Sequence, residues 1–302
     1  MKKQKIKSII YKIIPERLMK VSRQKRVAAI HDISGIGKCS LTAAIPVISA
    51  AGIEAAVMPT AVLSTHTGDM KGFTYRDLTE DLVAFYGHWK SLGVEFDGIY
   101  SGFLGSAKQV DIVCDFIDEF KNPDAVILVD PAMADSGLMY TTFNKEFAKE
   151  MKKLCKKADI IVPNITEAVF LLGEEYREPP YSDEYINDLL IKLSLLGPSM
   201  VVLTGIHTEE NKISCFAYDK NRDEFYRCDS ERYSGTYYGT GDIFASALLG
   251  AYMNGKDIFR STEIALDFTC KAVKRTFEAG TDTRLGVNFE QGISDYIKNL
   301  EG

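Results

Sequence analysis

The chain has 302 residues, of which 46% are hydrophobic and 26% charged, and its net charge is −6. This composition is that of a globular protein with a full core, and it excludes collagen-like and low-complexity classes. No apolar run approaches the ~20 residues of a membrane-spanning helix, so we expect no membrane span. The six cysteines form no CxxC pair. Together with the lack of a secretory signal, this predicts reduced thiols in the cytoplasm.

The first 26 residues differ from the rest of the chain. They hold ten Lys/Arg and one acid, Glu16, which gives this segment a net charge of +9 and leaves −15 for the remainder. An acidic body argues against nucleic acid as the main partner. We expect a basic N-terminal extension over residues 1–25 and one domain over 26–302. The extension fits either a solvated arm or an amphipathic helix at a membrane surface.

The domain is predicted to open with a strand over residues 26–30, a glycine loop over 31–38 and a helix over 40–51. The loop is not a Walker A site, because Asp32 replaces the first glycine and Cys39 follows the lysine. Asp32 and Ser34 come directly after the strand, where open α/β sheets bind ligands. Both are therefore predicted to contact a substrate.

Residues 53–67 are predicted to be a strand or flap that ends in a polar tip, because they are rich in β-branched residues. His66 lies at this tip among hydroxyl side chains. A surface loop histidine and a histidine that contacts a substrate ring fit this pattern equally well. A helix is predicted next, over residues 76–92.

Two acidic residues follow the next buried strand. Strand 97–101 leads into a second glycine loop and helix 108–120, after which residues 125–129 form a near-continuous apolar strand. Asp130 ends this strand and Asp135 lies five residues on, before helix 142–157. Carboxylates at a strand end either hold Mg²⁺ through water or cap the next helix.

Asn164 and Glu167 follow strand 158–162 with the spacing of a helix capping box. Either they only cap, or Glu167 also reaches a metal and phosphate. Helix 184–196 and strand 200–205 come next, followed by a hairpin of 213–218 with 224–229. The last predicted helices span 242–253 and 260–279.

The glycine turn from Gly239 to Asp242 precedes an apolar helix. Gly239 and Gly241 leave backbone N–H groups unobstructed at a positive helix end, where an anion binds well. Asp242 places a carboxylate beside that position, as a base for phosphoryl transfer requires. The local pattern fits a simple helix cap by Thr240 or Asp242 equally well.

Strands and helices alternate about every thirty residues, without an internal repeat. This predicts an α/β fold with a largely parallel central sheet and helices on both faces. The loops at the carboxyl ends of the strands are the expected site.

Four motifs agree with one family. They are G-T-G-D at 239–242, V-P-N-I-T-E at 162–167, V-D-P-A-M-A-D at 129–135 and L-S-T-H-T-G at 63–68. On these motifs the chain resembles the vitamin B6 (pyridoxal) kinases of the ribokinase-like superfamily, across residues 26 to 290. The resemblance implies a ribokinase-like three-layer sandwich, ATP and Mg²⁺ as cofactors, and a homodimer formed through the flap. It leaves open a requirement for a monovalent cation.

The resemblance also implies roles for individual residues. Asp242 is implied as the base, with Gly239, Thr240 and Gly241 forming an anion hole. Asp130 and Glu167 are implied to support Mg²⁺. The implied nucleotide contacts are Asn164, Thr204, Tyr140 and Asp135. The implied substrate contacts are Thr60, Thr65 and His66, beside the residue-based candidates Asp32 and Ser34.

The first loop departs from the pyridoxal kinases. Residues 32–37 look like the D-P-S-G-G-A-G loop of hydroxymethylpyrimidine kinases, although both substrates are flat heterocycles with a hydroxymethyl group. We therefore expect an ATP-dependent kinase that phosphorylates the hydroxymethyl group of pyridoxal, pyridoxamine or pyridoxine. The alternatives are a hydroxymethylpyrimidine (phosphate) kinase, a non-catalytic vitamin-binding module and, from the basic extension alone, a membrane or nucleic-acid adaptor.

Overall fold

The computed structural model describes residues 23–302, so the predicted extension over residues 1–25 lies almost wholly outside the described residues. Within this range one sheet has nine strands in the order β11-β10-β9-β8-β5-β4-β1-β2-β3. Their bounds are β1 Arg26–Ile36, β2 Glu54–Thr65, β3 Tyr75–Asp77, β4 Gly98–Ser101, β5 Val126–Val129, β8 Ile160–Ile161, β9 Met200–Ile206, β10 Lys212–Asp219 and β11 Glu224–Glu231. A separate pair consists of β6 (Ala134–Asp135) and β7 (Leu138–Met139).

The centre of the sheet is parallel and its edges are antiparallel. Strands β2, β1, β4, β5, β8 and β9 pair in parallel, whereas β3 and the β10–β11 hairpin add antiparallel edges. Parallel strands need crossover connections, and the intervening helices supply them. The predicted largely parallel α/β sheet is confirmed.

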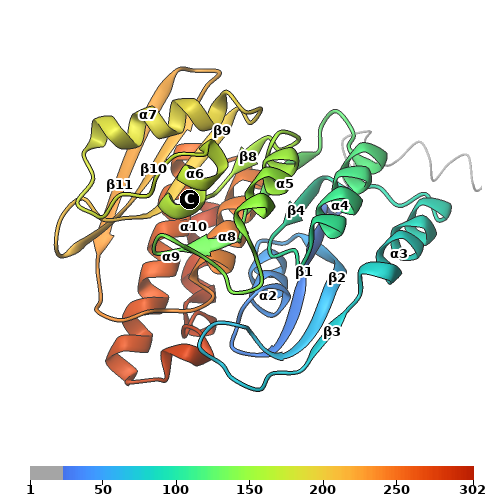
Figure 1. Ribbon diagram of the computed structural model, residues 1–302, viewed down its shortest axis with the longest axis horizontal. Helices are drawn as coiled ribbons and strands as arrows, with labels where there is room; N and C mark the ends of the chain where they lie inside the picture. The colour runs from blue at the N-terminus through green and yellow to red at the C-terminus, as the bar shows by residue number, and fades with distance from the viewer. Residues whose placement is uncertain (1–22) are drawn as a thin grey trace, which may run out of the picture.

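Helices cover both faces of the sheet (Figure 1). One face carries α2 (Leu41–Ala50), α8 (Thr240–Met253), α9 (Ile258–Ala279) and α10 (Ile293–Glu301). The other carries α3 (Thr79–Ser91), α4 (Ala107–Phe120), α5 (Lys145–Cys155), α6 (Ile165–Leu172) and α7 (Asp183–Ser194). Two short 3₁₀ turns, η2 (Thr283–Leu285) and η3 (Glu290–Gly292), precede α10. The three-layer sandwich is therefore confirmed.

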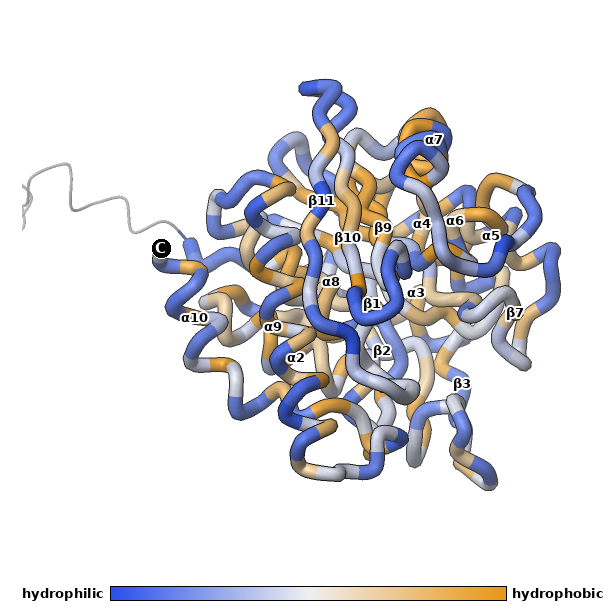
Figure 2. Tube along the Cα trace, turned by 90° about the vertical axis from the view of Figure 1, so that its left-hand side faces the viewer, coloured by the Kyte–Doolittle hydropathy of each residue, from blue (hydrophilic) through white to orange (hydrophobic). Residues whose placement is uncertain are grey.

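The sheet divides the interior into two apolar cores, because successive side chains of each strand point to opposite faces. In β1, Ala28 and Ile30 pack with α3–α7, whereas Val27 and Ala29 pack with α2 and α8–α10. A strand buried on both faces requires such an uninterrupted apolar run, because successive side chains point to opposite faces. In Figure 2 the peripheral loops are mostly hydrophilic, while β9 in the interior is hydrophobic. No helix among residues 23–302 combines the length and apolarity needed to cross a membrane.

The first strand is longer than predicted. β1 continues to Ile36 by pairing with β2 as far as Thr65, so residues 31–36 belong to a strand and not to a loop. The register shifts between His31 and Ile33, where β2 holds one extra residue opposite Asp32. Such a bulge redirects side chains near active sites. Glycine is typical of loops, so the glycines in this segment made the sequence pattern indicate a loop and not a strand.

One helix boundary differs from the prediction, and one helix was not predicted. Arg76 lies in β3, and α3 begins only at Thr79, whose backbone N–H donates to Asp77 over 2.6 Å. The helix α10 near the C-terminus was not predicted, although it packs Tyr296 into the core against Phe268. The other predicted strands and helices are present with end shifts of a few residues.

Candidate active site

The predicted site residues lie in or just after the central strands. Asp32 belongs to β1, Asp130 follows β5, Asn164 begins α6 after β8, and Thr204 lies in β9. Since these strands are parallel, their carboxyl ends meet at one edge of the sheet, and the N-terminus of α8 lies at the same edge. Contacts described below join them into one site.

The N-terminus of α8 has no side-chain cap in the described structure. Gly239 is the N-cap residue, with φ +75°, and no side chain accepts from the first amides of the helix. The Thr240 hydroxyl instead donates to the carbonyl oxygen of Tyr237 over 3.2 Å. The interpretation of this turn as a simple side-chain cap is therefore wrong. Its amide groups keep their hydrogen-bonding capacity for an anion.

The two glycines of the turn serve different purposes. Gly239 has a left-handed backbone, and a side chain there would collide with the carbonyl oxygen of Lys38. Gly241 has an ordinary backbone, and a methyl group at residue 241 would lie 3.6 Å from Asp130 Oδ2, an unstrained contact. Gly239 is thus required for the fold of the turn, whereas Gly241 leaves room over an exposed amide.

Asp242 projects from the first turn of α8 with 17% of its side chain exposed. The pKa of its carboxyl is raised to about 7, mainly by burial; the backbone amide of Ser40 opposes the rise and the nearby charge of Asp32 adds to it. A carboxyl with a pKa near neutrality exchanges protons readily at physiological pH, as a general base requires. No Lys or Arg of residues 23–302 forms an ion pair with it.

Asp32 is held by two serine hydroxyls. Ser40 Oγ donates to Asp32 Oδ1 over 2.5 Å, and Ser34 Oγ donates to Asp32 Oδ2 over 3.1 Å. Burial raises the pKa of Asp32, and both hydroxyls oppose that rise. Ser40 has φ +54°, a strained backbone for a residue other than glycine. Ser40 therefore links the two carboxylates: its hydroxyl donates to Asp32, and its backbone amide donates to Asp242.

Asp130 and Glu167 form an acidic pair next to the turn. Asp130 is buried, and burial followed by the charges of Glu167 and Asp242 raises its pKa well above the ordinary value. Burial also raises the pKa of Glu167 to about 8, which its backbone hydrogen bonds oppose. Within residues 23–302, no Lys or Arg is among the groups that shift the pKa of either carboxyl. Two buried carboxylates without a cation favour an external positive charge.

The predicted capping box is confirmed. Asn164 Oδ1 accepts from the Glu167 amide over 2.9 Å, and Glu167 Oε2 accepts from the Asn164 amide over 2.9 Å. Glu167 Oε1 also accepts from the Met133 amide over 3.1 Å, which fixes the loop after Asp130 against α6. The backbones of Thr204 and Asn164 pair in parallel just beyond the regular part of the sheet. Glu167 thus has a structural role that does not depend on a metal.

Tyr140 and Asp135 lie at the rim of the acidic pair. Burial, then the charges of Glu167 and Asp135, raises the pKa of the Tyr140 hydroxyl, so this hydroxyl faces the same carboxylates. Asp135 is exposed and accepts from the amide of Ser136 over 2.7 Å. Both positions are open to a nucleotide, but neither side chain contacts the glycine turn in the hydrogen bonds of the described residues.

His66 stacks on the residue before the glycine turn, and both of its ring nitrogens have partners within the protein. Nδ1 accepts from the Gly68 amide over 3.1 Å, and Nε2 lies 2.6 Å from the carbonyl oxygen of Arg284. The ring stacks on Tyr238 with centroids 4.8 Å apart, and the Tyr238 hydroxyl donates to Asp69 over 2.5 Å. In this arrangement His66 fastens the flap to the residue before the turn.

The two threonines of the flap are also engaged within the protein. Thr60 is buried, and its hydroxyl donates to the carbonyl oxygen of Phe103 over 3.5 Å. The Thr65 hydroxyl donates to the carbonyl oxygen of His66 over 3.2 Å. A contact of either hydroxyl with a substrate requires that it exchange its present acceptor or accept an additional bond.

Sequence reasoning missed Ser40, Tyr238 and His31. Ser40 was assigned to a helix, and its left-handed backbone leaves no signal in the sequence. Tyr238 directly precedes the G-T-G-D motif, so its position was a usable signal. His31 is fully buried beside Asp242, and its place next to Asp32 could have suggested a role.

The residues fit a hydrated divalent cation better than a fully protein-coordinated one. Among residues 23–302 no group of three His, Cys, Asp or Glu side chains is arranged as a ready metal site. Asp130 and Glu167 nevertheless supply hard oxygen ligands without a cationic partner, and Mg²⁺ usually keeps several waters and binds one or two carboxylates together with substrate phosphates.

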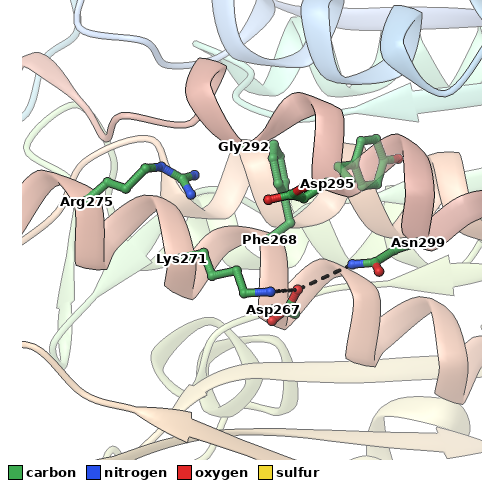
Figure 3. Close-up of a pocket in the computed structure, with 8 residues that line it drawn as sticks. Asp267, Phe268, Lys271, Arg275, Gly292, Asp295 and Asn299 are labelled. Atoms are coloured by element: carbon green, nitrogen blue, oxygen red, sulfur yellow. Dashed lines mark hydrogen bonds and ion pairs between the residues drawn. The ribbon is translucent and has the colours of Figure 1, made fainter.

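A separate pocket between α9 and α10 does not belong to this site. Figure 3 shows side chains of both helices around a space of about 10 Å³, enough for one water molecule. Within it, Asp267 accepts from Lys271 over 2.9 Å and from Asn299 over 3.4 Å. No predicted site residue lines it.

Known proteins resemble both the sequence and the fold. Residues 37–286 match the family model of phosphomethylpyrimidine kinase. A hydroxymethylpyrimidine/phosphomethylpyrimidine kinase from Aquifex aeolicus is 29% identical over 186 residues, which cover 61% of this chain and 69% of that protein.

Two solved structures are especially informative. A putative phosphomethylpyrimidine kinase from Bacteroides thetaiotaomicron, crystallised with pyridoxal, is 39% identical, with a TM-score of 0.87 over 93% of this chain and 96% of that one. The pyridoxal kinase from Leishmania donovani, in complex with ADP and pyridoxamine, is 19% identical. It shares the fold, with a TM-score of 0.79 over 92% of this chain and 96% of that one.

Proposed function

Since the chain belongs to the ribokinase-like phosphomethylpyrimidine kinase family, we propose that it transfers the γ-phosphoryl group of ATP to a B6 vitamer. The acceptor is the hydroxymethyl group of pyridoxal, pyridoxamine or pyridoxine, and the product is the 5′-phosphate. The observation that carries the proposal is the position of Asp242, whose carboxyl has a pKa of about 7, beside the uncapped amides of α8. ADP bound to a structural relative supports ATP as the donor.

Asp242 acts as the general base in this proposal. Its carboxylate accepts the proton of the hydroxymethyl group while the hydroxyl oxygen forms a bond to the γ-phosphorus. The bond between that phosphorus and the β–γ bridging oxygen breaks, and ADP leaves with the electron pair. The amides of residues 239–241 stabilise the charge on the transferring phosphoryl oxygens, a contribution that electrostatic preorganisation makes large.

Mg²⁺ would be held on the acidic side of the site, by Asp130 and Glu167. When bound it neutralises charge on the nucleotide phosphates. Asn164, Thr204, Tyr140 and Asp135 are proposed to contact the nucleotide on this side. The protein contributes these two buried carboxylates, whose pKa values burial raises, and an added positive charge would stabilise their ionised forms.

The choice of heterocycle rests on two opposing observations. The pyridoxal in the Bacteroides thetaiotaomicron structure and the S-T-H-T-G flap favour a B6 vitamer. The loop at Asp32, the family model and the Aquifex aeolicus relative favour hydroxymethylpyrimidine as a second candidate. Asp32 and Ser34 are proposed to contact the ring, because Asp32 lies at the bulge in β1, hydrogen-bonded to Ser34 and close enough to Asp242 for its charge to affect that carboxyl.

The test is ADP release measured with four acceptors side by side: pyridoxal, pyridoxamine, pyridoxine and hydroxymethylpyrimidine. We expect the highest kcat/KM with a B6 vitamer and a product heavier by one phosphoryl group in mass spectrometry. Asp242→Asn is the matched control, with kcat lowered roughly 10²–10⁴-fold. A higher kcat/KM with hydroxymethylpyrimidine would establish the second candidate. Binding of vitamers without ADP release would instead indicate a non-catalytic binding module.

We also propose a homodimer that forms through the flap side of the sheet. Neighbouring elements there expose several large apolar side chains, and such side chains together favour association. They are Val62 and Tyr75 of β2 and β3, and Val83 and Phe85 of α3. Light scattering on the purified chain tests this, and substitution of Val83 and Phe85 by Ser should shift the mass to that of a monomer.

A further inference from the structure

His31 is a buried histidine that the proposed reaction does not use. Its side chain is fully buried, and neither ring nitrogen has a hydrogen-bond partner among the described residues. Burial lowers its pKa to about 3, so the ring is neutral at physiological pH. A buried N–H without an acceptor destabilises a folded protein, so a histidine at this position has an unfavourable effect on stability that no observed hydrogen bond offsets.

The fold directs this ring toward Asp242. His31 follows Ala29 by two positions in β1, so its side chain points to the face covered by α8. His31 Nδ1 lies 3.8 Å from Asp242 Oδ1. This separation is too long for a hydrogen bond, but a shift of less than 1 Å would close it.

The position of the ring is fixed on two further sides. The ring contacts Tyr100 edge to face, with centroids 4.2 Å apart. On another side it lies so close to Gly102 that any side chain at residue 102 would collide with it. The ring is thus packed between Tyr100 and Gly102 in an orientation that places Nδ1 3.8 Å from the Asp242 carboxylate.

We propose that His31 is a positioning residue for the proposed base, donating its Nδ1–H to Asp242 when substrate binding closes the site. The inference rests on the proposed function of Asp242. The neutral ring cannot take up the proton that Asp242 accepts. It instead holds one carboxylate oxygen, so that the other oxygen faces the hydroxyl group of the substrate. Hydrogen bonds to charged acceptors are stronger than those between neutral groups.

The chain offers a matched test at this position. Asn and Leu have nearly the same shape, but only Asn places an N–H where Nδ1 lies, while Gln places its amide where Nε2 lies. We expect His31→Leu and His31→Gln to lower kcat roughly 10- to 100-fold with little change in KM, as loss of a charged hydrogen bond predicts. His31→Asn should retain most of the kcat.

Stability should follow the opposite order. Leu removes the unpartnered polar group, so the Tm of His31→Leu should equal or exceed that of His31→Asn, although its kcat is lower. A purely structural histidine would lower kcat and Tm together. Equal kcat values for the Leu and Asn variants, or a change confined to KM, would overturn the proposal.

A second measurement does not depend on activity. Urea unfolding of wild type, His31→Leu, Asp242→Asn and the double variant, each with and without saturating pyridoxal, measures whether the two side chains interact once the site is occupied. We expect non-additive free energies with pyridoxal bound and nearly additive ones without it, because the 3.8 Å separation closes only on binding. Additive values in both conditions would overturn the proposal. If the wild-type protein binds pyridoxal but phosphorylates none of the four acceptors, the proposed function fails, and this cycle still decides whether His31 acts on Asp242.

Discussion

Ser40 donates its hydroxyl to Asp32 across 2.5 Å, and it does so from a left-handed backbone with φ +54°. The same residue presents its backbone amide to Asp242, where it lowers the pKa of the carboxyl. One strained residue thus links the proposed ring-binding side to the proposed base. Strain of this kind persists only where surrounding structure enforces it, and it concentrates at functional sites.

The first prediction concerns this link. Ser40→Ala and Ser40→Gly both remove the hydrogen bond to Asp32, so both should raise KM for the heterocycle several-fold and leave KM for ATP unchanged. Gly also relieves the left-handed strain, so its Tm should exceed that of the Ala variant. Ser34→Ala is the control for the longer bond and should have the smaller effect on KM. Equal KM values for wild type and both Ser40 variants would contradict the role of this hydroxyl.

The second prediction concerns pH. Because Asp242 must be ionised to act as a base and its pKa is about 7, kcat/KM should fall tenfold per pH unit below that value. A profile measured from pH 5.5 to 9 checks this, and an acidic limb near pH 4 would argue against Asp242 as the titrating base.

The same shift affects stability with a defined sign. The pKa of Asp242 is higher in the folded protein than the ordinary value of 3.8, so the folded state binds the proton more tightly. Its stabilising contribution is complete below pH 3.8 and is lost as the pH rises through 7. Asp242→Asn avoids this loss. Its Tm relative to wild type should therefore be higher at pH 8 than at pH 5, as differential scanning fluorimetry can show.

The third prediction separates the two glycines. Gly239→Ala should lower Tm markedly, because the backbone is left-handed and the new methyl group meets the carbonyl oxygen of Lys38. Gly241→Ala should keep a near-normal Tm, yet its kcat should fall at least tenfold because the methyl group obstructs the amide facing the phosphoryl group. A Gly241→Ala variant with normal kcat would exclude close approach of the phosphoryl group to this turn.

The fourth prediction concerns the metal. Glu167→Gln keeps one carbonyl oxygen for the capping bond with the Asn164 amide, but its NH2 group then faces the Met133 amide, so Tm should fall modestly. We expect this variant and Asp130→Asn to need a higher Mg²⁺ concentration for half-maximal activity, since each loses a carboxylate. Glu174→Gln is the control, because Glu174 pairs with Lys192 at the surface. Unchanged Mg²⁺ dependence in both test variants would remove these carboxylates from the metal site.

Local sequence patterns were sufficient for most of the fold. The apolar strand ending at Val129 and the amphipathic helix of residues 107–120 are set by side-chain periodicity, which acts over short distances. The capping box of Asn164 and Glu167 was also readable, because its two partners lie three residues apart. The extension of β1 to Ile36 was not readable, since it depends on pairing with a distant strand.

For the site, the sequence by itself determined which chemical groups are present: the G-T-G-D turn, the acids that follow the strands and the flap histidine. Only the tertiary structure decided their surroundings. It left α8 uncapped, engaged both ring nitrogens of His66 and placed His31 and Ser40 against Asp242. The reason is physical. Burial and through-space contacts set the pKa and the free hydrogen-bonding capacity of a side chain, and both arise from residues far apart in the chain.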